Sequence, residues 1–329
     1  MVVYISILPV KISNMRNTRL KKDSEPSRII QILKAGMWAI LSIFRMAWGF
    51  IRIIWYWLER IFLVVLLLWL TVGLAWWLSQ KPSLYRDWLL AESVLPEIAF
   101  SWETVAIKNI RNHTWTTDKE FTPGYYDATY NIADLEKVYY IITPFSDRDW
   151  PAHTMLSFSF SWGQHVVISA EVRKERGEDF DALKGILNQY ELMYVIADEI
   201  DVIKLRTNYR KNEVYMYPID TPKEKVQELF RTMLIRADKL SREPEFYNTL
   251  WNNCTTSILM HANALRTEKL SGGIYRILPS HSDEIVYGAE LIDTELSLGD
   301  ARAYYRIDES ARAMTDTVDF SDIIRKPIR

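Results

Sequence analysis

Residues 152–174, AHTMLSFSFSWGQHVVISAEVRK, decide the fold, because apolar and polar side chains alternate on both sides of a Trp-Gly-Gln turn. Two alternating runs around a short turn predict a β-hairpin with one buried face. The even positions carry large apolar side chains and are expected to face the core. The odd positions are expected to form a polar face, which holds His153, Ser157, Ser159, His165, Ser169, Glu171 and Arg173.

The register of this hairpin follows from its two faces. Cross-strand partners lie on the same face, so odd positions must pair with odd positions. The turn then sets Ser159 against His165, and further along it sets His153 against Glu171. The sequence therefore predicts an imidazole and a carboxylate side by side near the open end of the hairpin.

The second informative stretch is residues 245–263, EFYNTLWNNCTTSILMHAN, which contains the only cysteine, Cys254. A single cysteine excludes an intramolecular disulfide. Asn252 and Asn253 are good N-cap residues, so Cys254 is expected in the first turn of a helix. A helix N-terminus and a neighbouring imidazole both lower the pKa of a thiol and favour the reactive thiolate. The alternative is a buried, inert thiol.

His153 is the preferred partner of Cys254 among the five histidines. It starts a strand on the polar face, and Glu171 opposite it can fix the imidazole tautomer, as the third member of a Cys-His-acid triad does. His281, in the loop 279–283, is the second choice. The remaining histidines fit less well because they have no acid in register, lie at a solvated turn, or lie two helical turns from the thiol: His113, His165 and His261.

The rest of the region after residue 98 predicts a mixed α+β domain. Strands are expected at 104–110, 138–143, 192–197, 202–205 and 214–219. A helix should follow, with a capping box from Thr221 to Glu224 and Pro222 at its first position.

Residues 61–78, IFLVVLLLWLTVGLAWWL, contain no charge and are just long enough to cross a bilayer. Residues 1–60 carry ten Lys/Arg against three Asp/Glu, so the positive-inside rule places them in the cytoplasm and the region from residue 80 outside. A cleaved signal peptide is disfavoured because the leader would be unusually long. The sequence therefore predicts a single-pass membrane protein.

The remaining segments are assigned around this span. Residues 1–34 form a basic cytoplasmic tail. Residues 35–60 place Arg45 and Arg52 on one helical face, which suits an amphipathic helix in the membrane interface. A second membrane crossing is the alternative, and it would invert the topology. Residues 79–98 are a juxtamembrane linker with a short helix, and residues 99–329 form the catalytic domain.

The sequence lacks the motifs expected for binding a metal, another cofactor or a nucleic acid. The sequence has no HExxH motif, no paired cysteines and no phosphate-binding glycine-rich loop, so neither a metal nor another cofactor is expected. A net charge of −2 gives no reason to expect nucleic-acid binding. Arg206 and Arg210 are candidates for binding a phosphate or carboxylate, although a solvated strand end is the simpler interpretation. With Ser157 they form the candidate substrate-binding set.

At these motifs the chain resembles the Lnb-type N-terminal periplasmic domain family of bacterial proteins, which is associated with lipoprotein N-acylation. The matching stretches are RDW (86–88), FTPGYYDATYNIADL (121–135), AHTMLSFSF (152–160), ISAEVRKERGE (168–178), QYELMYVIADEIDVIKLRTNYR (189–210) and FYNTLWNNCTTSI (246–258). The resemblance implies a circularly permuted papain-like α+β fold, with the histidine strand first and the cysteine helix last. It also implies that His153 and Cys254 occupy catalytic positions, with Glu171 as third member.

We therefore expect a membrane-anchored cysteine acyltransferase or thioesterase in the bacterial inner membrane. It would act on a lipid or lipoprotein ester in the periplasm through an acyl-Cys254 intermediate. A cell-wall or protein cysteine peptidase is the first alternative, and a non-catalytic membrane interaction protein is the second. An apolar groove beside Cys254 would favour lipid, and a polar open cleft would favour peptide. A His153 imidazole more than about 8 Å from the thiol would favour the non-catalytic alternative.

Overall fold

The computed structural model describes residues 28–145, 151–292, 294–314 and 319–326. The chain divides into two units, Met1–Ala75 and Trp76–Arg329. Most of the predicted basic tail, residues 1–27, lies outside the described residues.

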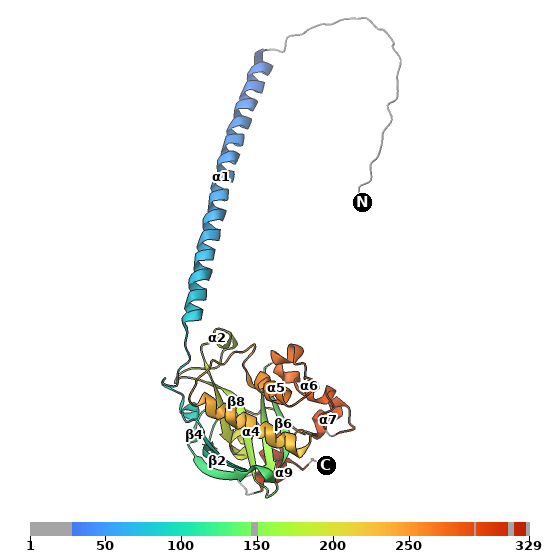
Figure 1. Ribbon diagram of the computed structural model, residues 1–329. Helices are drawn as coiled ribbons and strands as arrows, with labels where there is room; N and C mark the ends of the chain where they lie inside the picture. The colour runs from blue at the N-terminus through green and yellow to red at the C-terminus, as the bar shows by residue number, and fades with distance from the viewer. Residues whose placement is uncertain (1–27, 146–150, 293, 315–318, 327–329) are drawn as a thin grey trace, which may run out of the picture. The chain divides into compact units, whose positions relative to one another are not determined.

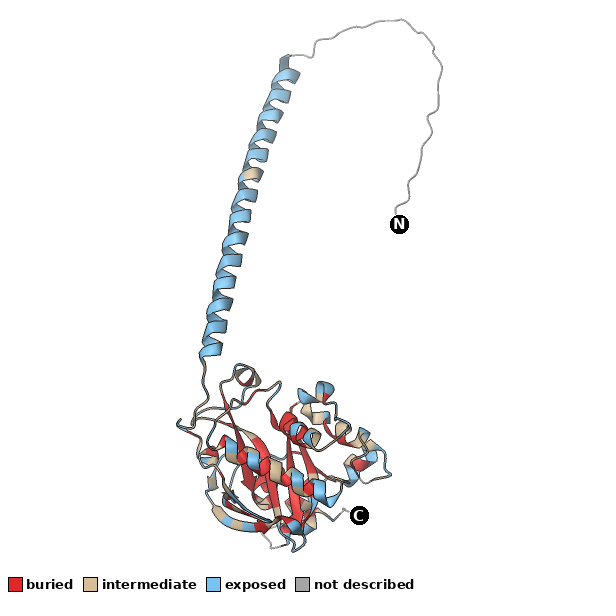
Figure 2. Cartoon of the chain, in the orientation of Figure 1, coloured by how far each residue is buried: buried red, intermediate tan, exposed pale blue. Residues whose placement is uncertain are grey.

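The first unit is dominated by one helix, α1 (Arg28–Ser79), whose side chains are almost all exposed (Figures 1 and 2). Among the described residues it is the one helix whose length and composition would allow it to cross a membrane. The two segments expected separately, 35–60 and 61–78, lie in this single helix. At 1.5 Å per residue it is about 78 Å long, so only part of it can lie in a hydrocarbon core of about 30 Å. The helix has no turn at Glu59-Arg60, where a second crossing would need one.

The second unit is built on a mixed sheet with the order β1-β2-β9-β8-β7-β6-β10, and β5 pairs with β2. Neighbours are antiparallel apart from β2 and β9, which are parallel. A small second sheet pairs β3 with β4. The strands are β1 (Glu97–Ser101), β2 (Thr104–Arg111), β3 (Thr114–Trp115), β4 (Phe121–Thr122), β5 (Tyr125–Asn131), β6 (Leu135–Pro144), β7 (Ala152–Phe160), β8 (His165–Arg173), β9 (Glu191–Ala197) and β10 (Tyr215–Pro218).

Helices and short helical turns cover both faces of this sheet. The helices are α2 (Ala182–Ile186), α3 (Glu199–Lys204), the π-helix η3 (Leu205–Tyr209), α4 (Lys223–Leu240), α5 (Cys254–Ala264), α6 (Asp283–Gly288), α7 (Leu298–Tyr304), α8 (Asp308–Ala313) and α9 (Phe320–Ile324). The 3₁₀ turns are η1 (Leu90–Glu92), η2 (Ile132–Asp134), η4 (Gly273–Arg276) and η5 (Pro279–His281). The unit is therefore mixed α+β, as expected from the sequence.

The predicted hairpin is confirmed, and so is its register from Ser159 opposite His165 to Leu156 opposite Ile168. The described strand pairing ends there, and His153 and Glu171 meet through their side chains. The expectation of a single buried face was wrong. Every residue of β7 is buried, and two clusters of apolar residues enclose the strand. The even face packs with α4 and α5, and the odd face packs with α3, α8 and α9. His165 is accordingly not solvated: its side chain is 9% exposed and bonds to Ser159 at 2.7 Å.

Two local predictions were also wrong, and one predicted helix is a single turn. Residues 202–205 form helix rather than strand, because Asp198 caps α3 by accepting from the backbone N–H of Ile200. The capping box at Thr221 does not form, since Pro222 occupies the N-cap of α4 without a side-chain cap. The short helix expected in the linker is a 3₁₀ turn at Leu90–Glu92, and β1 begins at Glu97.

Candidate active site

Cys254 is the first residue of α5, where the sequence placed it. Asn253 caps this helix: its side chain accepts from the Thr256 N–H at 2.9 Å, and the Thr256 hydroxyl accepts from the Asn253 N–H at 2.8 Å. This reciprocal pair fixes the first turn and keeps the positive end of the helix dipole at the thiol. Cys254 is buried, and its sulfur lies 3.9 Å from the Thr255 hydroxyl.

His153, the second residue of β7, lies between the thiol and Glu171. Its Nε2 is 3.0 Å from Glu171 Oε1 and 2.6 Å from the Ser169 hydroxyl. Because that hydroxyl itself donates to Glu171 at 2.9 Å, Nε2 must donate its proton toward the serine and glutamate oxygens. The hydrogen bond to Cys254 completes the arrangement, and Nδ1 is the ring nitrogen left for the sulfur. The three residues predicted to act together are therefore in contact.

The electrostatics of the three groups favour their charged forms. Burial alone would raise the pKa of Cys254, but the hydrogen bond and positive charge of His153 lower it to about 7. Burial would lower the pKa of His153, but the Glu171 carboxylate opposes it and the pKa is raised above its usual range. Burial is likewise outweighed at Glu171, whose pKa is held well below its usual range by His153 and Arg206. The reactive thiolate is thus substantially populated near neutral pH.

Of the three residues expected to bind substrate, Arg206 lies in the site but is buried behind the carboxylate. It donates to Glu171 Oε1 at 3.0 Å and to the Val202 carbonyl at 2.9 Å, so it orients Glu171. Arg210 has an exposed side chain within electrostatic reach of Glu171. Ser157 is not brought to the thiol: it donates to Glu199 and accepts from Arg325 at 3.2 Å.

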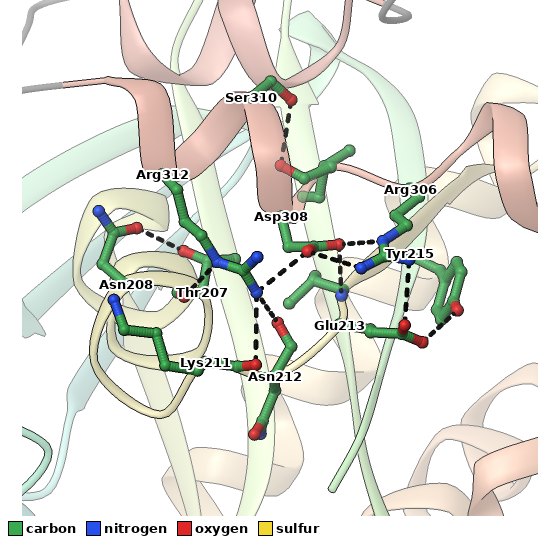
Figure 3. Close-up of polar contacts among 12 residues, drawn as sticks. Thr207, Asn208, Lys211, Asn212, Glu213, Tyr215, Arg306, Asp308, Ser310 and Arg312 are labelled. Atoms are coloured by element: carbon green, nitrogen blue, oxygen red, sulfur yellow. Dashed lines mark hydrogen bonds and ion pairs between the residues drawn. The ribbon is translucent and has the colours of Figure 1, made fainter. Parts of the chain in front are cut away.

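The π-helix η3, which carries Arg206, is held in place by hydrogen bonds from the C-terminal helix α8 (Figure 3). Arg312 of α8 donates to the carbonyls of Thr207 at 2.8 Å and Asn212 at 3.0 Å, on either side of the end of η3. Asp308, fully buried, accepts from Arg306 at 2.7 Å and pairs with Arg312 at 3.0 Å. Residues more than a hundred positions downstream therefore hold the arginine that supports Glu171.

Sequence reasoning missed two hydroxyl groups at the site. Ser169 lies between His153 and Glu171 on the predicted polar face, so the hairpin alternation alone could have identified it. Thr154 forms a hydrogen bond to Cys254 and its hydroxyl lies 3.2 Å from that of Thr255. Its position on the opposite face of β7 gave no signal, because only the packing of α5 on that face brings it to the thiol.

An apolar cavity of about 90 Å³ follows α5 from Thr255, the residue after Cys254. Thr255, adjacent to Cys254, lines it, as do Ile258, Leu259 and Ala262 at helical spacing. Tyr140 and Ser282 also line it and bond to each other at 2.6 Å. Burial raises the pKa of Tyr140, and the charge of Cys254 raises it further, which places this phenol near the thiol. The cavity therefore has hydroxyl groups near the sulfur and apolar walls along the helix.

The other histidines are engaged elsewhere. His113 accepts from the Gly124 N–H at 3.1 Å and stacks on Phe121. His261 bonds to the Tyr194 hydroxyl at 3.0 Å, and His281, the second-choice base, contacts Ser280 at 2.9 Å. Within the described residues, no three His, Cys, Asp or Glu side chains gather as metal ligands.

Comparison with known proteins adds one finding. Residues 121–280 match the family model described as the Lnb N-terminal periplasmic domain. The matched segment contains His153, Glu171 and Cys254. No curated protein and no solved structure matches the chain significantly. The match and the apolar helix α1 together indicate a membrane-anchored protein with a periplasmic domain.

Proposed function

We propose that this chain is a membrane-anchored cysteine acyltransferase or thioesterase that acts on the ester of a lipid or lipoprotein. The observation that carries the proposal is a thiol of lowered pKa that is hydrogen-bonded to His153 and whose neighbour Thr255 lines an apolar cavity. Apolar walls suit a fatty-acyl chain, whereas a peptide cleft would need polar groups for the backbone. Membrane lipids or lipoproteins are the proposed substrates.

In the proposed reaction, the Cys254 thiolate attacks the ester carbonyl carbon and forms a tetrahedral oxyanion. Backbone N–H groups in the first turn of α5 stabilise that oxyanion. The C–O bond then breaks, the His153 imidazolium gives its proton to the leaving alkoxide, and an acyl thioester on Cys254 remains. Neutral His153 next takes a proton from an acceptor amine or water, which attacks the thioester and restores the thiolate. Glu171 orients the imidazole and stabilises its charge throughout.

We also propose that residues 99–329 form a circularly permuted papain-like domain. The support is the order of the functional elements, since the histidine strand β7 precedes the cysteine helix α5 in the chain. The thiol at a helix start and the imidazole on an adjacent strand are the arrangement that a cysteine nucleophile requires.

The proposed topology is a single pass through the bacterial inner membrane, with the basic N-terminal tail in the cytoplasm. The excess of Lys/Arg before residue 61 supports it. Alkaline-phosphatase and green-fluorescent fusions to the C-terminus test it directly. Phosphatase activity without fluorescence is expected, and fluorescence without phosphatase activity would overturn the topology.

Trapping the acyl-enzyme tests the function. The full chain in lipid nanodiscs is incubated with lipid esters, and the peptide containing Cys254 is weighed by mass spectrometry. We expect a hydroxylamine-sensitive acyl adduct on Cys254, absent from Cys254→Ala and strongly reduced in His153→Ala. Ser159→Ala, which alters a buried hydroxyl away from the thiol, is the matched control and should acylate normally. An adduct that persists in Cys254→Ala, or none in the wild type while cell-wall peptides are cleaved, would contradict the proposal.

A further inference from the structure

Six large apolar side chains are exposed at one end of the unit Trp76–Arg329. Leu183 is 69% exposed and Trp251 is 53% exposed, although both are types that normally gain free energy by burial. They come from three separate segments: α2 with its flanks, the loop before α5, and the turn η4. We call this set the apolar rim, and it comprises Phe180, Leu183, Leu187, Trp251, Ile274 and Ile277.

Hydrogen bonds join the three segments into one surface. The Thr249 hydroxyl donates to the Ala182 carbonyl at 2.9 Å, and the Asn248 amide donates to the Ile186 carbonyl at 3.1 Å, so α2 is held on the loop before α5. The Asn253 amide donates to the Thr249 carbonyl at 2.7 Å and to the Arg276 carbonyl at 2.8 Å, so η4 is held on the same loop. The three segments that carry the apolar rim are therefore held to one another through the loop before α5.

The segments of the apolar rim are connected to the start of the cysteine helix. Asn253, which joins the loop to η4, is also the N-cap of α5, and Cys254 follows it directly. Trp251, the exposed aromatic side chain of this loop, therefore precedes Cys254 by three residues. A partner that covered the apolar rim would therefore lie close to the candidate active site.

The contacts of residues 83–86, which follow the apolar helix α1, indicate what covers the apolar rim. Three residues, 80–82, separate the end of α1 from Ser83, whose N–H donates to Glu191 Oε1 at 2.9 Å. Arg86 pairs with the same carboxylate at 2.9 Å. Glu191 forms a β-bridge with Phe246, which begins the loop that holds α2. The chain leaving the apolar helix is therefore fastened to the same end of the domain that carries the apolar rim.

We propose that the apolar rim docks into the membrane leaflet next to the anchor helix and brings Cys254 to the lipid surface. Bulky apolar side chains with a Trp among them are the residues that enter the boundary between head groups and acyl chains. A flexible tether alone would allow every orientation of the domain, whereas the rim selects the one that presents the thiol to lipid. The inference concerns binding, so it stands or falls separately from turnover.

Fluorescence of a polarity-sensitive label tests the docking in the full chain reconstituted into liposomes. In a Cys254→Ser background, single cysteines at Leu183, Trp251 and Ile274 are labelled with nitrobenzoxadiazole. Trp162→Cys is the matched control, because this exposed tryptophan lies in the β7–β8 turn, roughly 20 Å along the strands from His153. Circular dichroism checks that each variant is folded.

We expect blue-shifted emission at the three rim positions and quenching there by lipids with doxyl-labelled acyl chains, with neither effect at Trp162→Cys. Water-like emission at all three rim positions would overturn the proposal. A blue shift that is insensitive to the lipid quencher would overturn it too, because the rim would then be covered by protein. If that blue shift also rises with protein concentration, the covering protein is a second copy of the chain.

Discussion

Two clusters built from the same four residue types lie on one face of the hairpin. The site cluster consists of His153, Ser169, Glu171 and Arg206. The turn cluster lies nearer the β7–β8 turn and consists of Ser157, Ser159, His165, Glu199 and Arg325. Each contains a histidine, serine, glutamate and arginine, yet only the site cluster meets a thiol.

The two clusters differ in which group the carboxylate faces. In the site cluster, Glu171 lies 3.0 Å from His153, and the pKa of that histidine is raised against burial. In the turn cluster, Glu199 is paired with Arg325 through both oxygens, at 2.6 and 2.8 Å. Burial lowers the pKa of His165, and the Arg325 charge opposes the raising effect of Glu199. Pairing geometry, rather than residue type, therefore decides which of the two histidines has a raised pKa.

We expect the largest difference between the two clusters in the turnover of a lipid ester. Cys254→Ala and His153→Ala should each lower turnover of a lipid ester by about four orders of magnitude, because the two groups act as a unit. The double variant should be little slower than either. Ser159→Ala and His165→Ala should turn over the same lipid at nearly the wild-type rate, measured by lipid mass spectrometry. Equal losses at His153 and His165 would remove the distinction between the clusters.

For the free energy of unfolding, we expect the larger loss in the turn cluster rather than in the site cluster. Arg325→Ala leaves the fully buried Glu199 without its cation, and we expect unfolding free energy to fall by about 3–5 kcal/mol. The pKa of Glu199 is lowered in the fold, so this pairing stabilises above the ordinary carboxyl pKa and is lost as pH falls. Arg206→Ala should cost less, because Glu171 keeps His153 and Ser169. Urea unfolding of both variants at pH 7 and pH 4 measures this, and a larger loss for Arg206→Ala would contradict it.

A smaller effect is expected from the cavity, which adjoins only the site cluster. Ala262→Phe fills the apolar end and should lower turnover of long-chain esters about tenfold relative to short-chain esters, corresponding to about 1.4 kcal/mol. Met260→Phe, on the exposed face of the same helix, is the matched control and should leave the chain-length preference unchanged. An unchanged preference in Ala262→Phe would place the acyl chain elsewhere.

The sequence predicted the parts of this comparison that depend on local periodicity. Alternation fixed the faces and register of the hairpin, and N-cap preferences located Cys254 at a helix start. The second apolar layer was missed because α8 and α9 come from distant sequence with weak periodic patterns. The short segment 202–205, with three apolar residues and Lys204, is compatible with a strand or a helix, and only the cap at Asp198 distinguishes the two. Ser157 shares a face with His153, but alternation alone cannot separate two clusters along one strand.

The rate of Cys254 alkylation by iodoacetamide as a function of pH tests the central claim most directly. The thiolate is the reacting form, so the wild-type rate should reach half its maximum near pH 7. His153→Ala removes the hydrogen bond and charge that oppose burial, so its profile should shift to higher pH, whereas His165→Ala should keep the wild-type profile. A wild-type thiol that titrates near the ordinary value of about 8.5, or a profile that His153→Ala leaves unchanged, would contradict the account.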